Sequence, residues 1–395
     1  MDDPRALKQA HLEEKIAPFI PQGTELVKPP CPYFDVCGGC QLQHIPYPAQ
    51  LKWKRQHLLH LLAEQGIEAD ELTDETRGLV DSPYLYRNKA DFSARTWDNE
   101  LHLGYRPHGG RGELVEIDEC PIVLPAVNKA LAAVRQKLHL VPSLARKLVS
   151  LVVRCSLSTG KSALLYHSKL KDETVYETLT KNAASIDENL AGGTFVKKRK
   201  EYIYGEGELT EAVGNINLTY SVRSFFQANP RLLPQLCEAV KELAEPCKKG
   251  VMMDVFCGVG LFALYLSNDF EQLYGIESAP CSVKMAQRNA QNNGVTSVQF
   301  VRDIAEERFK QFMDTGVEPG LVVLDPPRSG LGKSVVASLN SLNPSPVVVL
   351  VSCNPHSLAI DLAGLLKGGY KLERIIPVDM FPQTEHLEVV ARLTR

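Results

Sequence analysis

The sequence lacks an apolar run long enough to span a membrane, and residues 1–8 do not resemble a secretory signal peptide. It also lacks internal repeats and long low-complexity segments, and its 44% hydrophobic and 23% charged residues predict an ordinary globular chain. These absences predict a cytoplasmic protein without membrane association. Thiols stay reduced in that compartment, so the ten cysteines are not expected to form disulfides. Clustered cysteines therefore need a metal or a catalytic explanation.

A strong excess of charge is also missing. The formal net charge is −3, which neither favours nor excludes a nucleic-acid partner, because docking of phosphates depends on the local field. Basic residues concentrate at 87–111 and 197–200, and each cluster alone is most simply a solvated face. Aromatic residues interleave the first cluster: Tyr84, Tyr86, Phe92, Trp97 and Tyr105. That stretch is a candidate RNA-binding surface, although aromatics at such spacing are more often core.

The length of 395 residues predicts two or three domains. Residues 1–30 are expected to form a short helix over 4–17 followed by a Pro/Gly-punctuated connector. Residues 48–65 have the leucine spacing of an amphipathic helix, which is expected to pack on the C-terminal domain.

Residues 85–220 are mixed but rich in strand signals. Asp98-Asn99 separates two alternating segments, 92–97 and 101–106, and predicts a β-hairpin. A second strand pair is predicted at 151–155 and 162–166.

The pattern changes near Phe225, after which short apolar strands alternate with helical stretches. The predicted strands are 251–256, 273–277, 298–301, 321–325 and 347–353. This alternation is typical of a doubly wound parallel sheet, so the predicted fold class is α/β, with a Rossmann-like C-terminal domain and a smaller strand-rich α+β domain before it. The predicted divisions are residues 1–30, 31–223 and 224–395.

A glycine-rich turn follows the first of these strands. Asp254-Val-Phe-Cys-Gly-Val-Gly260 opens a helix, and Glu277 ends the second strand seventeen residues later, where a carboxylate would grip a ribose diol. The motif also fits a dinucleotide fingerprint with Ala263 as the third small residue, a weak match by itself. One acid stands at each of four strand ends: Asp254, Glu277, Asp303 and Asp325. A single such acid is often a helix cap, but four in register favour S-adenosylmethionine (SAM) over a nicotinamide cofactor.

Residues 347–351 are a Val/Leu run with the composition of a buried parallel strand, and the polar residues and proline that follow force a turn. Cys353 is therefore placed at the carboxyl end of a strand, where open α/β sheets bind ligands. Its thiol is a candidate nucleophile. A buried packing role is about equally common for a lone free cysteine.

Asp325-Pro-Pro-Arg328 follows the fourth strand, and its prolines fix a rigid loop without amide donors. Enzymes that methylate exocyclic amines usually end the comparable loop in an aromatic residue, so Arg328 argues against an amine target. Cytosine-C5 enzymes usually place a Pro-Cys nucleophile in this loop, and the loop here has none.

Cys31, Cys37 and Cys40 lie within ten residues, and Cys120 supplies a fourth soft ligand. Four thiolates hold either zinc or an iron–sulfur cluster, and spacing alone leaves both open, with zinc the commoner. The other cysteines have no such company and are predicted to be packing residues: Cys155, Cys237, Cys247, Cys257 and Cys281.

Five spaced motifs agree with one family. They are Ser224-Phe-Phe-Gln227, Asp254-Val-Phe-Cys-Gly-Val-Gly260, Asp325-Pro-Pro-Arg-Ser-Gly330, Val351-Ser-Cys-Asn-Pro355 and Asp379-Met-Phe-Pro-Gln-Thr-Glu-His-Leu-Glu388. In this order they resemble the motifs of the RNA (uracil-C5)-methyltransferase family, which includes bacterial enzymes that form ribothymidine in 23S rRNA and in tRNA. The resemblance spans residues 31–395 and implies a SAM-dependent enzyme that forms 5-methyluridine.

The resemblance also implies roles for the matched residues. Cys353 would add to C6 of uracil and make C5 nucleophilic toward the methyl group of SAM, and Glu388 would then remove the C5 proton as general base. Without the resemblance, Glu388 would be a surface residue at the start of a last strand. Asp325 would contact the uracil edge or the cofactor. The residues implied to form the cofactor site are Gln227, Asp254, Phe256, Gly258, Glu277, Asp303 and Asp325. Leu261 stands where some relatives carry a polar residue, which puts one polar cofactor contact in doubt.

For Cys31, Cys37, Cys40 and Cys120 the resemblance implies a [4Fe–4S] cluster with a structural role. RNA is the implied partner, and no obligate protein partner is predicted. We favour 23S rRNA, because only 30 residues precede Cys31, too few for the N-terminal β-barrel of many relatives. The T-loop of tRNA is the alternative. A non-catalytic iron–sulfur RNA-binding protein is disfavoured by the presence of both Cys353 and Glu388.

Overall fold

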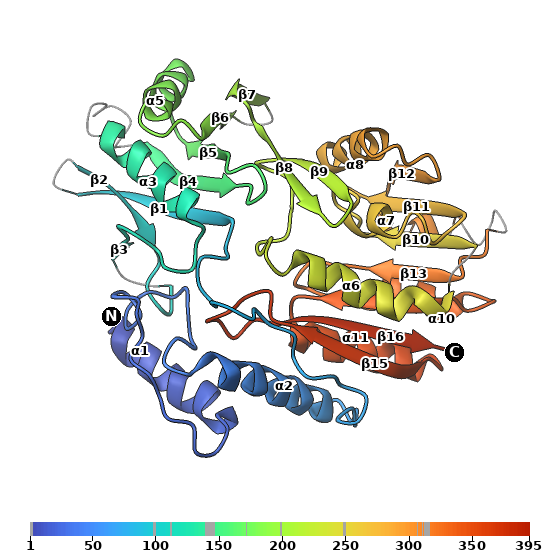
Figure 1. The fold of residues 1–395 in the computed structure, drawn as a ribbon. Helices are drawn as coiled ribbons and strands as arrows, with labels where there is room; N and C mark the ends of the chain where they lie inside the picture. The colour runs from blue at the N-terminus through green and yellow to red at the C-terminus, as the bar shows by residue number, and fades with distance from the viewer. Residues whose placement is uncertain are drawn as a thin grey trace.

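The computed structural model describes residues 3–97, 100–110, 113–138, 147–170, 172–197, 200–247, 250–305, 307–309, 311 and 317–395. Within these ranges the chain folds around two seven-stranded sheets that lie side by side, with a two-stranded hairpin between them (Figure 1). Three features named from the sequence fall outside the described residues: the turn at Asp98-Asn99, Arg111, and the basic pair Lys198-Arg199.

The N-terminal segment is helical, as predicted, and its helical turns continue past residue 17. α1 (Pro4–His11) begins after Asp3, whose side chain accepts a hydrogen bond from the backbone N–H of Arg5. It runs on through a π-helical turn, η1 (Leu12–Ile16), and a 3₁₀ turn, η2 (Ala17–Phe19).

The predicted amphipathic helix is α2 (Tyr47–Glu64), and it begins and ends one residue earlier than expected. Leu58 and Leu62 are fully buried in one hydrophobic cluster with Val322 and Leu358 of the C-terminal part of the chain. α2 therefore packs beside the second sheet, next to α11, as Figure 1 shows. Among the described residues, the helices are all too short or too polar to cross a lipid bilayer.

The first sheet is mixed, with the strand order β3-β2-β1-β4-β5-β6-β7. The predicted hairpin is present as β1 (Lys89–Trp97) paired antiparallel with β2 (Glu100–Tyr105). The second predicted pair is β4 (Leu148–Cys155) with β5 (Ser162–Ser168). The other strands and the helices packed on this sheet are β3 (Val115–Glu116), β6 (Leu190–Lys197), β7 (Lys200–Gly205), α3 (Pro125–Leu138) and α5 (Thr174–Ala184).

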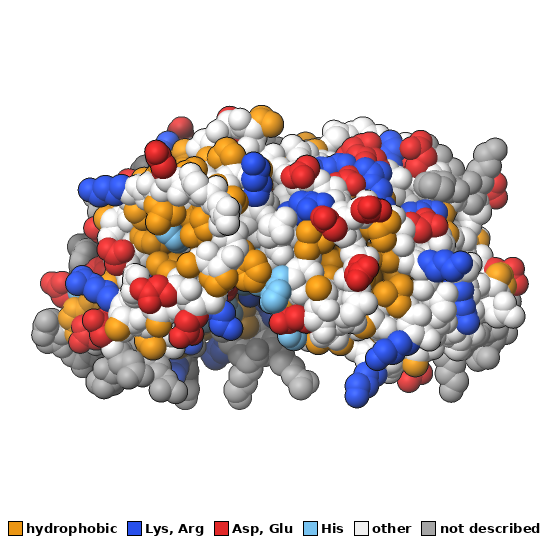
Figure 2. All heavy atoms as spheres, turned by 90° about the horizontal axis from the view of Figure 1, so that it is seen from below, with side chains coloured by type: hydrophobic (Ala, Val, Ile, Leu, Met, Phe, Trp, Pro, Cys, Tyr) orange, Lys and Arg blue, Asp and Glu red, His pale blue; other side chains and the backbone are white. Residues whose placement is uncertain are grey.

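Two of the five aromatic residues in the candidate RNA-binding stretch belong to the core, so these two cannot stack on RNA bases. Phe92 is fully buried because alternate residues of β1 point into the core, and Tyr86, which precedes β1, is fully buried in a small cluster with Phe34 and Ile122. Trp97 is 39% exposed, but its ring stacks on His102. On the face drawn in Figure 2, basic and acidic side chains of the described residues are intermixed rather than gathered in one basic band.

The second sheet has the order β12-β11-β10-β13-β14-β16-β15. Its five parallel strands confirm the predicted alternation: β10 (Val251–Val255), β11 (Gln272–Glu277), β12 (Val298–Arg302), β13 (Leu321–Leu324) and β14 (Val347–Ser352). The last two strands were not predicted in this form. β15 (Lys371–Val378) is new, and β16 (Glu388–Thr394) lies antiparallel between β14 and β15.

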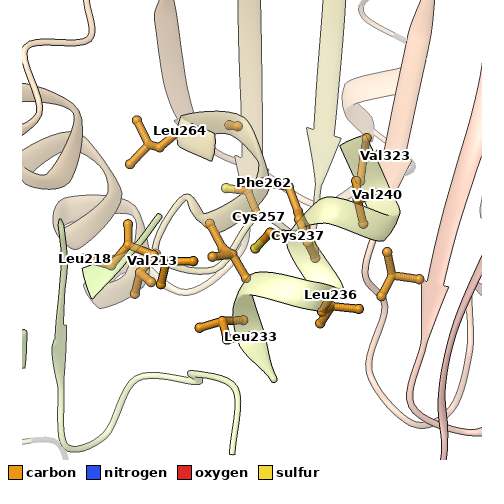
Figure 3. Packing of buried hydrophobic residues seen from close by; sticks show 14 of the residues in the cluster. Val213, Leu218, Leu233, Leu236, Cys237, Val240, Cys257, Phe262, Leu264 and Val323 are labelled. Carbon is orange, nitrogen blue, oxygen red and sulfur yellow. The ribbon is translucent and has the colours of Figure 1, made fainter. Parts of the chain in front are cut away.

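Both faces of this sheet are covered, as a Rossmann-like fold requires. In β13 the side chains of Leu321 and Val323 belong to one hydrophobic cluster, and those of Val322 and Leu324 belong to the other. The first cluster is closed by α6 (Leu233–Ala244), α7 (Leu261–Tyr265) and α8 (Pro280–Asn292). Figure 3 shows Cys237 of α6 beside Phe262, and Val240 of α6 beside Val323. The second is closed by α2, α10 (Gly332–Ser341) and α11 (Pro355–Lys367).

The two sheets are joined through the hairpin β8 (Glu208–Val213) and β9 (Ile216–Ser221) and the segment that follows it. Arg154 of β4 is 1% exposed, and its guanidinium donates to the backbone carbonyls of Ser224 and Phe226 at 2.5 and 3.0 Å. Asn88 donates through Nδ2 to the carbonyl of Gln227 at 3.1 Å. The first sheet therefore fixes the backbone of the segment that brings Gln227 to the second sheet.

Candidate active site

Cys353 directly follows β14, at the carboxyl end of a central parallel strand, where the sequence placed it. The next residue, Asn354, caps α11 by accepting a hydrogen bond from the backbone N–H of His356 at 3.2 Å. Asn354 also donates through Nδ2 to the carbonyl of Arg328 at 3.0 Å, which ties the turn to the loop after β13. The thiol is half-buried and lies at the carboxyl edge of the sheet, the edge at which open α/β sheets bind ligands.

Glu388 lies at the same edge of the sheet as Cys353, on a strand that runs antiparallel to β14. It is the first residue of β16, and Ser352 of β14 pairs with Val389 in the antiparallel register. The next residues along the two strands, Cys353 and Glu388, therefore lie opposite each other. Glu388 is 1% exposed, and neither of its carboxylate oxygens has a hydrogen-bond partner among the described residues. It begins a last strand, as expected, but it is not a surface residue.

Asp325 completes the group from the end of β13. Its backbone N–H donates to the carbonyl of Val255 at 3.2 Å, and its Oδ2 accepts a hydrogen bond from Gln227 Nε2 at 3.3 Å. Gln227 is 4% exposed. The structure thus brings together four of the residues named from the sequence: Cys353, Glu388, Asp325 and Gln227.

Burial dominates the electrostatics of this group. It raises the pKa of Asp325 to about 7, with the nearby charge of Asp254 adding to the effect, and it raises the pKa of Glu388 well above its usual range, with Asp325 adding to the effect. It also raises the pKa of the Cys353 thiol to about 12, helped by the two carboxylates and opposed by Arg328. At neutral pH the free site therefore holds a neutral thiol beside two carboxyl groups that keep their protons to higher pH than ordinary acids do.

We predict that alkylation of Cys353 by iodoacetamide is slow at pH 7 and accelerates about tenfold per pH unit up to pH 10, because only the thiolate reacts. Glu388→Gln removes a negative neighbour and should increase the rate at the pH values where Glu388 is ionised. Mass spectrometry of the peptide that contains Cys353 gives the rate, with Cys247 as an internal reference. A plateau near pH 8 to 9, as for an ordinary cysteine with a pKa of about 8.5, would contradict this picture of the site.

A second group of predicted residues surrounds a cavity at the carboxyl ends of β10, β11 and β12. Phe256, Glu277 and Asp303 line this cavity of about 110 Å³. Glu277 is held in place by the backbone N–H groups of Gly258 at 3.1 Å and Ala279 at 2.7 Å. A carboxylate, an aromatic ring and a second acid around one small cavity have the composition of a nucleoside site.

Asp254 and Leu261 are not among the residues that line this cavity. Asp254 is 1% exposed and accepts a hydrogen bond from Ala263 N at 2.9 Å, so one of its oxygens caps the short helix α7, while the other has no partner among the described residues. Burial raises the pKa of Asp254 to about 7. Leu261 is 7% exposed within the hydrophobic cluster under α7. The Leu261 side chain therefore packs in the hydrophobic core beside α7.

The glycine turn provides a second prediction. Gly260 has φ +91°, and a Cβ there would meet Phe300 Cζ at 2.7 Å, whereas Gly258 has φ +54° and open space around it. A left-handed backbone costs about 1–2 kcal/mol in either alanine variant. Gly260→Ala should lose about 1–3 kcal/mol more, because the ring must move. Urea unfolding without cofactor measures the free energy of unfolding of both variants. Equal losses in Gly258→Ala and Gly260→Ala would contradict the close packing of Phe300 against Gly260.

The four cysteines of the predicted cluster come together around one cavity of about 220 Å³. Burial raises the pKa of Cys37 to about 11 and that of Cys40 to about 12, and it also raises the pKa values of Cys31 and Cys120. In the part of the chain that the structure describes, no three His, Cys, Asp or Glu side chains approach closely enough to hold a single metal ion.

One buried cation accompanies these thiols and was not anticipated from the sequence. Lys8 of α1 is 2% exposed, and its ammonium donates to the backbone carbonyls of Cys37, at 3.3 Å, and of Cys40. The ammonium also lies 4.7 Å from the ring centroid of Phe34. Burial lowers the pKa of Lys8, and nearby Cys40 and Cys37 oppose that shift.

The chain is similar to known RNA methyltransferases. The family model for tRNA (uracil-5-)-methyltransferases matches residues 46–395. Uncharacterized RNA methyltransferases of Clostridium acetobutylicum and Halalkalibacterium halodurans are 29% and 30% identical to the chain, and each alignment covers 96% of this chain and 86% of the relative.

Among solved structures, the Pyrococcus abyssi tRNA (uracil-54, C5)-methyltransferase in complex with S-adenosyl-L-homocysteine is similar to this chain. It superposes with a TM-score of 0.71 at 26% identity, over 91% of this chain and 85% of that one. The family match extends through both groups of residues described above and covers most of the chain. The chain therefore belongs to the tRNA (uracil-5-)-methyltransferase family of SAM-dependent RNA methyltransferases.

Proposed function

We propose that this protein forms 5-methyluridine in RNA through a transient covalent bond between Cys353 Sγ and C6 of the target uracil. The observation that carries the proposal is the register of β14 with β16, which places Cys353 opposite Glu388 beside Asp325. A nucleophile, a base and a second acid at one sheet edge are the groups that this chemistry requires.

The electron movements can be assigned to these residues. Sulfur adds to C6, the C5–C6 double bond becomes an enolate, and C5 takes the methyl group of SAM, which leaves as S-adenosylhomocysteine. Glu388 then removes the C5 proton, the double bond reforms, and the thiolate leaves C6. The raised pKa of the Cys353 thiol means that attack needs the loss of the thiol proton and protonation of the uracil oxygen together. Asp325, whose pKa burial raises to about 7, is proposed to contact that uracil edge.

SAM supplies the methyl group in this scheme, and the second group of residues is proposed to hold it. Phe256 would lie against the adenine ring of SAM. Glu277 and Asp303 would bind the ribose hydroxyls and the polar edge of the adenine, since all three residues line one cavity. Gln227, Asp254 and Gly258 would complete the SAM site on the side of the transferred methyl group. Asp254 is included because one of its buried oxygens has no partner among the described residues.

We also propose that Cys31, Cys37, Cys40 and Cys120 hold a [4Fe–4S] cluster. The support is that all four line one cavity, with buried Lys8 beside them to balance thiolate charge. A single zinc ion would require four sulfurs about 4 Å apart, since Zn–S bonds are about 2.3 Å. Analysis of anaerobically purified protein should find about four iron and four sulfide per chain. About one zinc and no sulfide would reject the proposal.

The RNA target is proposed to be a uridine of 23S rRNA, since the family that the motifs resemble includes bacterial 23S rRNA enzymes. The T-loop of tRNA is the second candidate, favoured by the similarity to the Pyrococcus abyssi tRNA enzyme. Both substrates are cytoplasmic, as we expect the protein to be.

One experiment tests the activity and separates the two targets. Total RNA from a strain that lacks the protein is incubated with methyl-labelled SAM, and the labelled nucleotide is then identified and mapped. The proposal predicts 5-methyluridine, in 23S rRNA for the first candidate and in tRNA for the second. Label in any other nucleoside, or no transfer to RNA at all, would overturn it.

A further inference from the structure

Glu388 follows a long loop, and residues from the N-terminal part of the chain hold that loop in place. β15 and β16 form a hairpin whose last paired residues are Val378 and Glu388, so residues 379–387 connect them. The position of Glu388 therefore depends on how this loop is fixed. In Figure 1 the end of the hairpin lies near the N-terminal segment and the start of α2.

Lys54 of α2 is the central anchor of the loop. Its side chain is fully buried, and its ammonium is paired with the equally buried carboxylate of Asp379 at the start of the loop. The same ammonium donates to the backbone carbonyls of Phe381 at 3.0 Å and His386 at 2.7 Å. The three hydrogens of one ammonium thus join the beginning and the end of the loop, two residues before Glu388.

The middle of the loop is held by Gln50 of α2 and by Tyr86. Gln50, one helical turn before Lys54, exchanges hydrogen bonds with Gln383: its Nε2 donates to the side-chain oxygen at 2.9 Å, and its Oε1 accepts from the backbone N–H at 3.1 Å. Gln383 has φ +71°, a conformation that costs a non-glycine residue free energy and therefore needs such support. Tyr86 donates through its hydroxyl to the carbonyl of Pro382 at 2.9 Å.

Nothing comparable holds the functional group of Glu388 itself. Both of its carboxylate oxygens are buried without a hydrogen-bond partner among the described residues. The direction of the carboxylate is therefore set by its backbone and by packing, and the backbone is set by the loop.

We propose that Lys54 is a positioning residue for the general base: through its contacts in loop 379–387 it fixes Glu388 for removal of the C5 proton. The inference rests on the proposed function. It assigns to an N-terminal helix a part in one step of the reaction, the step after methyl transfer. A misplaced base should leave sulfur addition and methyl transfer intact and slow only the release of the product.

The test compares Lys54→Met with Lys52→Met, an exposed lysine on the same helix. Each variant is incubated with methyl-labelled SAM and total RNA from a strain that lacks the protein. In Lys54→Met we expect turnover to fall about 10- to 100-fold while a labelled, denaturation-resistant protein–RNA conjugate accumulates, with unchanged affinity for S-adenosylhomocysteine. Lys52→Met should behave as the unmodified protein. Normal turnover in Lys54→Met, or loss of the conjugate together with turnover, would overturn the inference.

Lys54→Met leaves the buried carboxylate of Asp379 without its partner, which is costly to folding. The double variant Lys54→Met/Asp379→Leu removes both charges and is expected to fold, because an apolar pair of similar volume is often tolerated in such a position. It should accumulate the same conjugate. A well-folded double variant with normal product release would equally overturn the inference. Glu388→Gln distinguishes failure of the general base from failure of the positioning residue. If neither Glu388→Gln nor the Lys54 variants accumulate conjugate, the assignment of Glu388 as the base fails. If Glu388→Gln accumulates conjugate and the Lys54 variants do not, only the role of Lys54 fails.

Discussion

Replacement of Cys353 by alanine should abolish formation of 5-methyluridine, with a loss in kcat/KM of at least about 10⁴-fold. The reason is specific to the target carbon. C5 of uracil becomes nucleophilic only after a group adds at C6, and no other thiol adjoins Asp325 and Glu388 among the described residues. Transfer of label from SAM to the RNA identified by mapping measures the loss.

Binding should survive this substitution. The cavity lined by Phe256, Glu277 and Asp303 does not include Cys353, so affinity for S-adenosylhomocysteine should be unchanged, and RNA should still bind. Cys247→Ala is the matched control, since this half-buried cysteine lies after α6 and contacts Arg392. Full turnover by Cys353→Ala would end the proposed mechanism.

Replacement of Glu388 by glutamine should stop the reaction at a later point. The methyl group is transferred, but the C5 proton stays, so the enzyme should remain bonded to methylated RNA, and turnover should fall about 10²- to 10⁴-fold. Denaturing electrophoresis detects the conjugate as a labelled band heavier than the protein.

The same variant changes the charge of the site in a defined direction. Glutamine keeps the shape of Glu388 and removes the ionisable group whose pKa burial raises, so the thiol pKa should fall and conjugate formation should not slow. Glu373→Gln, a part-exposed glutamate on the neighbouring strand β15, is the control and should release product normally. A Glu388→Gln variant that released product at the normal rate would show that another group takes the proton.

The parallel part of the second sheet could be predicted because each strand is a short apolar run followed by polar or turn residues. β15 could not, because Pro377 and the charged pair Glu373-Arg374 interrupt its pattern. The structure explains this exception: β15 is the last strand in the sheet order, and an edge strand tolerates proline. The antiparallel direction of β16 follows from its hairpin connection to β15 through residues 379–387.

The candidate site was predictable in its residues and not in its geometry. Cys353 stood out through its place after a buried strand, but only the register of β14 with β16 brings Glu388 to it. The acids at the strand ends proved unequal: Glu277 and Asp303 line a cavity, while Asp254 lies beneath the turn as a partial helix cap. An acid at a strand end has the same appearance in sequence for both roles.

The support of the site was missed altogether, although the sequence held a signal. Gln50, Lys54 and Leu58 follow one another at intervals of four residues on one face of α2, and all three are buried. A glutamine and a lysine on an apolar helical face require partners. These partners, Asp379 and Gln383, lie more than 300 residues away in the chain, and only the fold brings them together.

Covalent capture tests the central claim most directly. RNA in which the target uracil is replaced by 5-fluorouracil is mixed with the protein and SAM. Fluorine at C5 cannot be removed as a proton is, so the bond between Cys353 and C6 should persist, giving a denaturation-resistant conjugate that requires SAM and is absent in Cys353→Ala. Failure of a preparation active on ordinary RNA to give any such conjugate would contradict the account.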